Sequence, residues 1–175
     1  MSDIKYRDED ELIKVDDSYF KKIPTDWKII KSNHIVDIIG SSVNENKINT
    51  DGKGISYFKV DDLNCSGKQI EKSKHFVEQH GFKGKTILIP KRGAAIATNK
   101  AKIVDKEFLL DPNLMGLKVR KNCICDYYMY SLLSRGLWDI ADVSTVPQIN
   151  NKHINSLKFC IPAKIEQQKI VNFLD

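Results

Sequence analysis

The stretch TILIPKRGAAIATNKAKIVDKEFLLDPNLMGLKV, residues 86–119, decides the fold class of this chain. It contains four short apolar runs, at residues 86–90, 94–98, 101–105 and 114–119. The segments between these runs, KRG, NK and DPN among them, are made of residues that favour turns. Short apolar runs bounded by turns predict a meander of mostly antiparallel strands. The centre of the chain is therefore expected to be a β-sheet.

Before this centre, the sequence predicts further strands and a polar loop. ISYFKV at 55–60 is β-branched and aromatic, which is typical of a strand. WKIIKSNHIVDIIG at 27–40 mixes two periods and predicts a strand followed by a short helix that ends at Gly40. SSVNENKINTDGKG at 41–54 has the composition of a loop. Residues 1–22 are polar and predict a lead-in to the compact part of the chain.

After the centre, apolar residues recur at steps of three and four, which predicts an amphipathic helix that packs on the sheet. The members of this stripe are Met129, Leu132, Leu133, Gly136, Leu137 and Ile140. Asn151 is expected to cap a short turn over 152–156. LKFCI at 157–161 then predicts a strand that stops at Pro162, and AKIEQQKIVNFLD at 163–175 begins another helix.

These elements predict an α+β fold, in which a twisted, mostly antiparallel sheet carries a few packing helices and is followed by the start of a C-terminal helix. We expect three regions: a polar N-terminal lead-in at 1–22, a compact domain at 23–162, and the helical region at 163–175. A chain of 175 residues is long enough to bury one substantial core.

Charge is distributed unevenly along the chain. The first 20 residues hold seven acidic and three basic residues, so the remaining residues carry most of the positive charge that gives a net +5. Residues 81–106 alone hold seven bases and one acid, Asp105. A local excess of positive charge indicates a polyanionic partner, nucleic acid before acidic lipid. A solvated, lysine-rich surface is the alternative explanation.

The sequence contains no complete catalytic motif, so we expect a protein that is not an enzyme. Asp111-Pro112-Asn113 lacks the second proline and the aromatic residue of a methyltransferase tetrapeptide. Asp37 with Glu45-Asn46-Lys47 imitates the carboxylate and lysine set of a metal-dependent nuclease, but the sequence places it in a loop. The cysteines lack the spacing of a zinc site, and GFKGK at 81–85 lacks that of a phosphate-binding loop. We expect neither a metal site nor a bound cofactor.

Location is predicted from three further features. No apolar run has the length of about 18 residues that a transmembrane helix needs. The acidic N-terminus lacks the apolar region of a signal peptide. The four cysteines show no disulfide framework, which favours a cytoplasmic protein with free thiols.

Polar residues in the predicted turns and loops form the candidate DNA-binding set. Gly93 permits a tight turn from which Lys91 and Arg92 project, and arginine can donate two hydrogen bonds to guanine O6 and N7. Lysine can contact guanine or phosphate, and the amides of asparagine and glutamine can bridge adenine N6 and N7. The full set is Lys91, Arg92, Asn99, Lys100, Lys102, Ser42, Lys47, Gln148, Asn150 and Asn151.

Taken together, these segments resemble a target-recognition domain of the specificity subunit of type I restriction-modification enzymes. The matching segments are IPTDW at 23–27, DIIG at 37–40, ISYFKVDDL at 55–63, TILIPKRGAAIAT at 86–98 and TVPQINNKHINSLKFCIPAKIEQQKIVNFLD at 145–175. The last segment is the most characteristic, with its Pro-Gln-Ile-Asn, its Ile-Pro and its Glu-Gln at the start of a helix. The resemblance covers residues 23–175.

The resemblance implies a non-catalytic reader of double-stranded DNA that recognises one half of a split target. In such subunits, long helices hold two recognition domains at a fixed distance. Residues 163–175 would then be the start of this spacer, and the chain a half-length piece. The residues expected to contact a partner on this helix are Glu166, Gln167, Ile170, Val171 and Leu174.

The resemblance also implies the partners. Modification subunits would bind S-adenosylmethionine and methylate adenine, and restriction subunits would use ATP and magnesium to translocate and cut. A second recognition domain, or a second copy of this chain, would pair through the spacer helix. Two alternatives stay open: a recognition domain of a single-chain restriction enzyme, and a protein-interaction module whose basic face is incidental.

Overall fold

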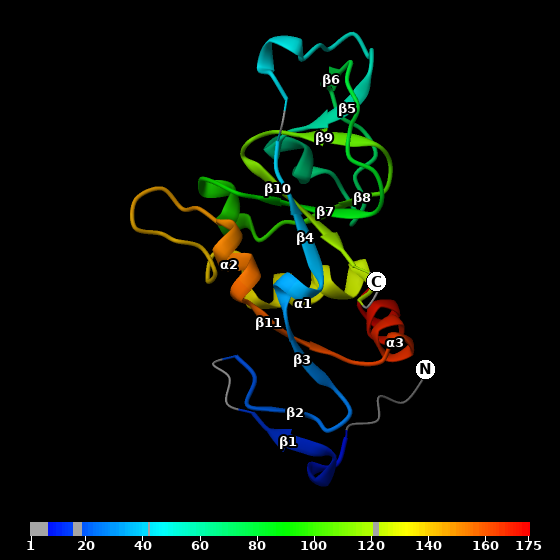
Figure 1. Cartoon of the computed structure of the whole chain (residues 1–175), viewed down its shortest axis with the longest axis vertical. Coiled ribbons are helices and arrows are strands. Elements are labelled where there is room, and N and C mark those ends of the chain that lie inside the picture. Colours follow the sequence, from blue (N-terminus) through cyan, green and yellow to red (C-terminus); the bar gives the residue numbers. More distant parts are fainter. Residues whose placement is uncertain (1–6, 16–18, 42, 121–122) are drawn as a thin grey trace.

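The computed structural model describes residues 7–15, 19–41, 43–120 and 123–175 (Figure 1). The strands in these ranges are β1 (Leu12–Lys14), β2 (Lys22–Pro24), β3 (Lys28–Lys31), β4 (Val36–Ile39), β5 (Ile55–Phe58), β6 (Phe76–Val77), β7 (Thr86–Pro90), β8 (Lys102–Val104), β9 (Phe108–Leu110), β10 (Leu114–Val119) and β11 (Lys158–Ile161). The α-helices are α1 (Cys125–Arg135), α2 (Asn151–Ser156) and α3 (Lys164–Leu174). Short 3-10 helices are η1 (Glu9–Glu11), η2 (Ser32–His34), η3 (Glu45–Lys47), η4 (Val60–Asn64) and η5 (Ala94–Thr98). The predicted α+β class is confirmed.

The largest sheet has the strand order β4-β10-β7-β8 and is antiparallel throughout. Three of the four runs predicted as strands between residues 86 and 119 are β7, β8 and β10. All five residues of β7 are buried, because apolar side chains cover both faces of this sheet. Ile87 and Ile89 belong to one apolar cluster and Leu88 to another, as the alternation of side chains along a strand requires.

The fourth predicted strand, at 94–98, is wrong, because these residues form η5. Gly93 has a φ of +79°, which glycine adopts without steric cost. The Ile96 N–H then donates to the Gly93 carbonyl at 3.1 Å and closes a tight turn. Ile96 is the buried residue of η5, and a run made largely of alanines offers a strand little further apolar area to bury.

The helix predicted before Gly40 is also wrong. Its first residues form the single turn η2, and its last four residues form β4, an edge strand of the largest sheet. The amphipathic helix is confirmed in type but lies earlier than predicted, since α1 begins at Cys125 and ends at Arg135. Gly136, with a φ of +82°, ends it.

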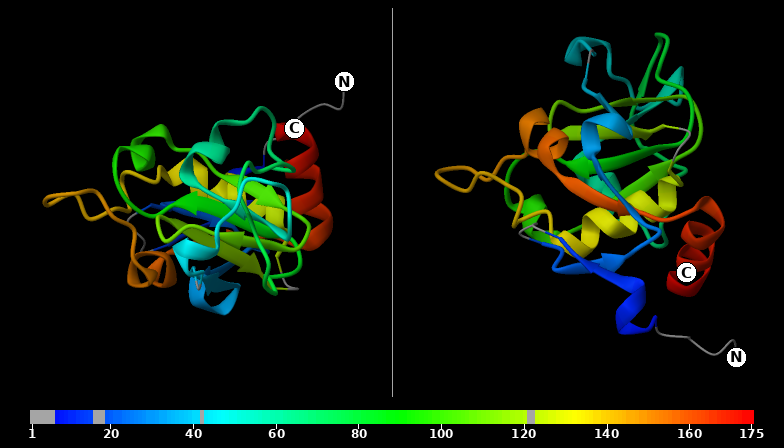
Figure 2. Two further views of the ribbon diagram at one scale, coloured as in Figure 1. Left: turned by 90° about the horizontal axis from the view of Figure 1, so that it is seen from above. Right: turned by 60° about the horizontal axis from the view of Figure 1, so that its bottom comes forward.

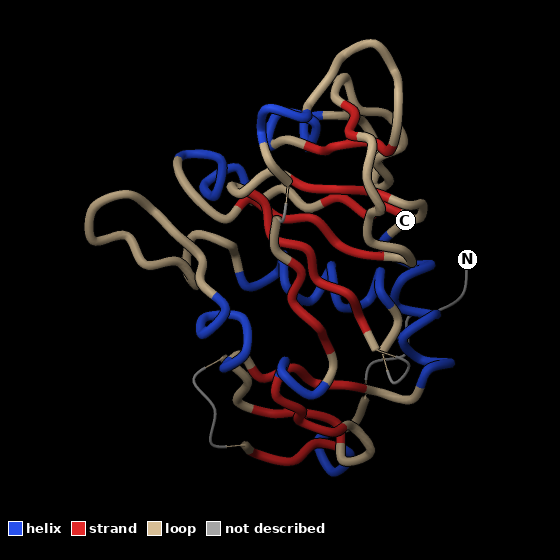
Figure 3. Tube along the Cα trace, turned by 45° about the horizontal axis from the view of Figure 1, so that its top comes forward, coloured by secondary structure: helices blue, strands red, loops and turns tan. Residues whose placement is uncertain are grey.

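The remaining sheets join segments that are distant in the sequence. β11 pairs with β3 in an antiparallel arrangement, so the region before α3 lies beside residues 28–31. β5 pairs with β6 in antiparallel fashion and with β9 in parallel fashion, which the predicted meander did not include. β1 pairs with β2, so part of the predicted lead-in is strand. The tube in Figure 3 shows these small sheets on two sides of the largest one.

Helix α1 packs between the largest sheet and β11, and it supplies much of the core (Figures 1 and 2). Two tyrosines of α1 are buried and bonded. The Tyr127 hydroxyl donates to the Cys160 carbonyl at 2.6 Å, and the Tyr128 hydroxyl lies 2.7 Å from Ser32 Oγ. α1 is therefore attached to β11 and to η2 by both packing and hydrogen bonds. Within the described ranges, no helix has the length and apolar character needed to cross a membrane.

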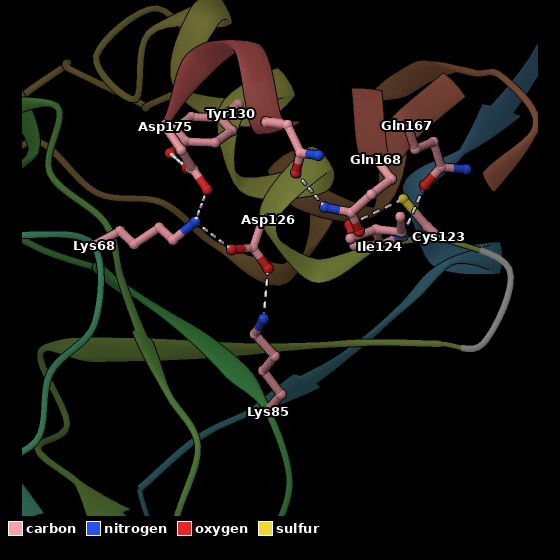
Figure 4. Close-up of polar contacts among 10 residues, drawn as sticks. Lys68, Lys85, Cys123, Ile124, Asp126, Tyr130, Gln167, Gln168 and Asp175 are labelled. Carbon is pink, nitrogen blue, oxygen red and sulfur yellow. Dashed lines mark hydrogen bonds and ion pairs between the residues drawn. The ribbon is translucent and has the colours of Figure 1, made fainter. Parts of the chain in front are cut away.

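A charged network joins α1 to its surroundings (Figure 4). The buried Asp126 carboxylate accepts from Lys85 Nζ at 2.6 Å and from Lys68 Nζ at 3.0 Å. Lys68 also pairs with Asp175, which accepts a hydrogen bond from the Tyr130 hydroxyl at 2.5 Å. Burial opposes ionisation of Asp126, but the two ammonium groups outweigh it and lower its pKa. Lys68 and Tyr130 likewise lower the pKa of Asp175.

This network predicts acid-sensitive stability. The pKa of both carboxyl groups, Asp126 and Asp175, is lower in the folded chain than the ordinary value of 3.8. Their contribution to the free energy of unfolding is therefore fully present above about pH 5. It is lost as the pH falls through the lowered pKa values of the folded chain. Urea unfolding between pH 6 and pH 3 should show this loss. In Asp126→Asn the dependence should be shallower, and an unchanged dependence would contradict the assignment.

Candidate nucleic-acid interface

The turn Lys91-Arg92-Gly93 lies directly beside Gln148, which is distant in the sequence. Arg92 and Gln148 form an antiparallel bridge. Two backbone bonds on either side of it hold the turn in place: the Gly93 N–H donates to the Pro147 carbonyl, and the Ile149 N–H donates to the Lys91 carbonyl, both at 2.9 Å. The structure therefore brings Lys91, Arg92 and Gln148 of the predicted set together.

Gln148 also closes a protruding loop, which we call the 142–148 ribbon. Asp142 and Gln148 exchange both backbone hydrogen bonds at 2.9 Å, so the two ends of the loop are paired like strands. Figures 1 and 2 show that this loop extends away from the sheets and helices. Val143 and Val146 are 49% and 60% exposed on it. The sequence prediction did not select these two valines.

Asp142, at the base of the 142–148 ribbon, lies near Lys152 and His153 of α2. The Asp142 carboxylate accepts from the Ser144 N–H at 3.1 Å, and this bond is the main reason why the pKa of Asp142 is lowered. Lys152 and His153 in α2 lower it further. The predicted residues Asn150 and Asn151 lie at the start of the same helix, where the Asn150 N–H donates to His153 Nδ1 at 3.1 Å. The cap of α2 is thus Asn150, one residue before the predicted cap.

Most of the basic segment 81–106 is engaged within the chain. Lys83 and Lys85 form ion pairs with carboxylates, at 3.1 and 2.6 Å. Lys100, Lys102 and Lys106 donate to polar groups of residues 56–71. Among the described residues, the side chains of Lys91 and Arg92 form no hydrogen bond or ion pair within the chain, and Arg92 is exposed. The cations of this segment that remain available for a ligand are therefore those of the turn.

Two residues of the predicted DNA-binding set, Lys102 and Asn99, form side-chain hydrogen bonds within the chain. Lys102 is 9% exposed, and its ammonium donates to the Cys65 carbonyl at 2.6 Å and to the Gly67 carbonyl. Asn99, at a φ of 49°, donates from Nδ2 to the Leu133 carbonyl and accepts from the Leu137 N–H, both at 2.9 Å. Lys102 thus holds the loop after η4 and Asn99 holds the end of α1, and their assignment to DNA binding stays a prediction.

Two other residues of the predicted DNA-binding set, Lys100 and Lys47, do not belong to the surface around the Lys91-Arg92-Gly93 turn. Lys100 donates to Asn64 Oδ1 at 2.6 Å. Lys47 is exposed in η3, which precedes the bridge between Asn49 and Phe76 at the far end of the molecule from α3 (Figure 1). Ser42 lies outside the described residues. The structure therefore gathers five of the ten candidates on one surface.

Lys102 is bonded within the chain, whereas the side chains of Lys91 and Arg92 have no such bond to the described residues, so replacing Lys102 should change stability and not DNA binding. Lys102→Met keeps the length of the side chain but leaves the Cys65 and Gly67 carbonyls without the ammonium donor. We expect the free energy of unfolding to fall by about 1–2 kcal/mol. DNA affinity of the folded fraction should stay unchanged. Urea unfolding and binding of a fluorescent duplex measure the two effects, and weakened DNA binding with unchanged stability would instead place Lys102 in the DNA interface.

The predicted partner residues of α3 lie mainly on its inner face. Gln167 and Val171 are buried against the chain's own core, and Ile170 packs on the same cluster. Glu166 accepts from Trp27 Nε1 at 3.1 Å. Leu174 is 50% exposed. In this chain the domain itself covers Gln167 and Val171, and the contact of the five residues with a partner stays a prediction.

A family model, the type I restriction modification DNA specificity domain, matches residues 24–175. The chain belongs to this family. No curated protein matches the sequence.

The specificity domain is also similar to solved structures. One chain from a structure titled for complex assembly and conformational transition of the type I R-M system is 20% identical, with a TM-score of 0.70, over 87% of this chain and 38% of that chain. The HsdS subunit from Thermoanaerobacter tengcongensis is 18% identical, with a TM-score of 0.68, over 95% and 40%. The type I restriction-modification S subunit from M. genitalium is 19% identical, with a TM-score of 0.60, over 85% and 38%. The specificity domain thus spans about two fifths of the length of these chains.

Proposed function

We propose that the specificity domain recognises one half of a split double-stranded DNA target through the surface formed by the Lys91-Arg92-Gly93 turn, the 142–148 ribbon and the start of α2. The observation that carries this proposal is the bridge between Arg92 and Gln148. Residues paired in this way have Cβ atoms about 4.5–5.5 Å apart, so an arginine and a glutamine project from neighbouring positions. Their guanidinium and amide groups suit guanine and adenine respectively.

The form of this surface supports entry into the major groove. That groove admits a two-stranded β-ribbon, and the protruding 142–148 segment is closed at its base by one antiparallel bridge between Asp142 and Gln148. Exposed Val143 and Val146 offer apolar contacts of the kind that meet thymine methyl groups. Lys91 and Lys152 flank the ribbon and can contact phosphates, which fix the position of a protein on DNA.

We further propose that the domain acts inside a larger enzyme and supplies no chemistry itself. Modification subunits would hold S-adenosylmethionine, and restriction subunits would use ATP and magnesium. α3 would begin the spacer that joins two recognition domains. Its outer face, where Ile165 and Phe173 are 75% and 70% exposed, is the face that remains open to a second helix. At 3.6 residues per turn these two residues point about 80° apart, and both point away from the buried Val171.

The proposal predicts weak, salt-dependent DNA binding by this chain alone. Each phosphate that the surface neutralises contributes a slope of about −0.9 to a plot of log affinity against log salt. With a fluorescent duplex of mixed sequence, the slope in the range 25–200 mM salt should correspond to about two to three phosphates. Affinity that is absent at low salt would contradict the proposal, and a flat slope would point to a non-DNA role for the basic surface.

A further inference from the structure

Gln167 is a polar residue with no exposed surface, and it joins three segments. Its Oε1 accepts from the Ile124 N–H, just before α1, at 2.7 Å (Figure 4). Its Nε2 donates to the Pro162 carbonyl, between β11 and α3, at 2.9 Å. Buried amides are stable only where both ends find partners. Both partners of Gln167 are backbone groups of fixed position, so they are satisfied in one orientation of α3.

Glu166 forms a second attachment at the same end of the helix. Its Oε1 accepts from Arg7 at 2.8 Å, and its Oε2 accepts from Trp27 Nε1 at 3.1 Å. Arg7 also pairs with Asp26 at 2.6 Å, so the guanidinium bridges the helix and the segment before β3. Adjacent residues of a helix point in directions about 100° apart. Glu166 and Gln167 therefore restrain rotation of α3 about its own axis from two sides.

The other end of α3 is restrained as well. Asp175 contacts Tyr130 of α1 and Lys68, and Lys68 continues to Asp126. Between the two ends, Val171 is 3% exposed in the main core cluster. Contacts at both ends and in the middle leave the helix little freedom to swing relative to the domain.

We infer that Gln167, supported by Glu166, is a positioning residue that fixes the direction in which α3 leaves the recognition domain. This inference deepens the proposed function and rests on it for its consequence. If α3 begins a spacer between two recognition domains, a fixed direction sets the distance and rotation between the two half-targets. Gln167 would then contribute to recognition of target spacing without contacting DNA.

Distance measurement by electron paramagnetic resonance tests the inference on this chain. Cys65→Ser removes the exposed cysteine, and the other three cysteines are buried. Burial raises the pKa of Cys123 and of Cys125 to about 12, which keeps these thiols unreactive. Spin labels at Lys118→Cys on β10 and Lys169→Cys on α3, both exposed, then report the helix relative to the largest sheet.

The parent should give one narrow distance peak. Gln167→Met, which preserves volume but removes both hydrogen bonds, should lose that single peak and give a broad distribution. Gln168→Ala, the neighbouring exposed glutamine, should keep the narrow peak. Circular dichroism confirms folding of each variant, and Gln167→Ala is the second test if the methionine variant is unfolded.

The outcomes separate the inference from the proposed function. Binding of the mixed-sequence duplex should stay within about twofold of the parent in Gln167→Met, because the helix is distant from the 142–148 ribbon. A narrow, unchanged peak in folded Gln167→Met overturns the inference and leaves the proposed function intact. Failure of the parent to bind DNA at low salt overturns the proposed function, whatever the distances show.

Discussion

Replacing Arg92 by alanine is expected to weaken binding of the chain's preferred duplex by roughly fivefold to 150-fold, or about 1–3 kcal/mol. The guanidinium is exposed and, within the described part of the chain, has no partner of its own, so the change removes no stabilising contact. It would remove two charge-assisted hydrogen bonds to one base. Titration of labelled duplexes by fluorescence anisotropy measures the effect.

Comparing the loss of affinity of Arg92→Ala for different DNA sequences shows whether Arg92 contacts a base or a phosphate. If Arg92 contacts a base, Arg92→Ala should relax the preference at one position and leave mixed-sequence binding nearly unchanged. A phosphate contact would weaken all sequences alike and flatten the salt slope by about one unit. Lys169→Ala removes one charge from the exposed side of α3 and is the matched control. Equal losses in Arg92→Ala and Lys169→Ala would show that only net charge matters.

Val171→Asp is expected to cause the largest loss of stability, on the order of 3 kcal/mol. Val171 is 3% exposed among the core residues that α3 and α1 share. A carboxylate there loses the apolar burial and must either find water or become protonated. We expect α3 to detach from the domain. Urea unfolding with circular dichroism measures both the loss and the decrease in helix content.

Phe173→Asp is the control on the opposite face of the same helix. Phe173 is 70% exposed, so its replacement should change the free energy of unfolding by less than about 0.5 kcal/mol. It should instead weaken any association between copies through the outer face. Equal destabilisation by the two variants would contradict the assignment of an inner and an outer face.

Local sequence patterns predicted the strands that carry strongly apolar, branched side chains. β7 and β10 lie where they were predicted, because runs such as TILIP bury on both faces of a sheet. The run AAIAT was wrongly predicted to be a strand. Alanine counts as apolar in such a pattern, but its side chain buries little surface area. The positive φ of Gly93 decided that local conformation, and the presence of a glycine in a sequence does not predict the sign of its φ.

The candidate interface was predicted in part. Arg92 and Gln148 were selected for their chemistry, but their adjacency depends on a bridge between residues 56 positions apart, which no local pattern contains. Lys102 was selected because it is charged, and the structure shows it donating to backbone carbonyls. The helical period of α3 correctly grouped Gln167 with Val171. It could not tell whether the chain's own core or a partner covers that face.

Selection from a random duplex library with the purified chain at low salt tests the central claim most directly. Rounds of capture and sequencing, run in parallel on the parent and on Arg92→Ala, show whether the chain prefers particular bases. We expect the parent to enrich one short motif and Arg92→Ala to lose the preference at one position of it. Recovery of the library without any enriched motif, under conditions in which the folded chain binds DNA, would contradict the claim that this domain reads sequence.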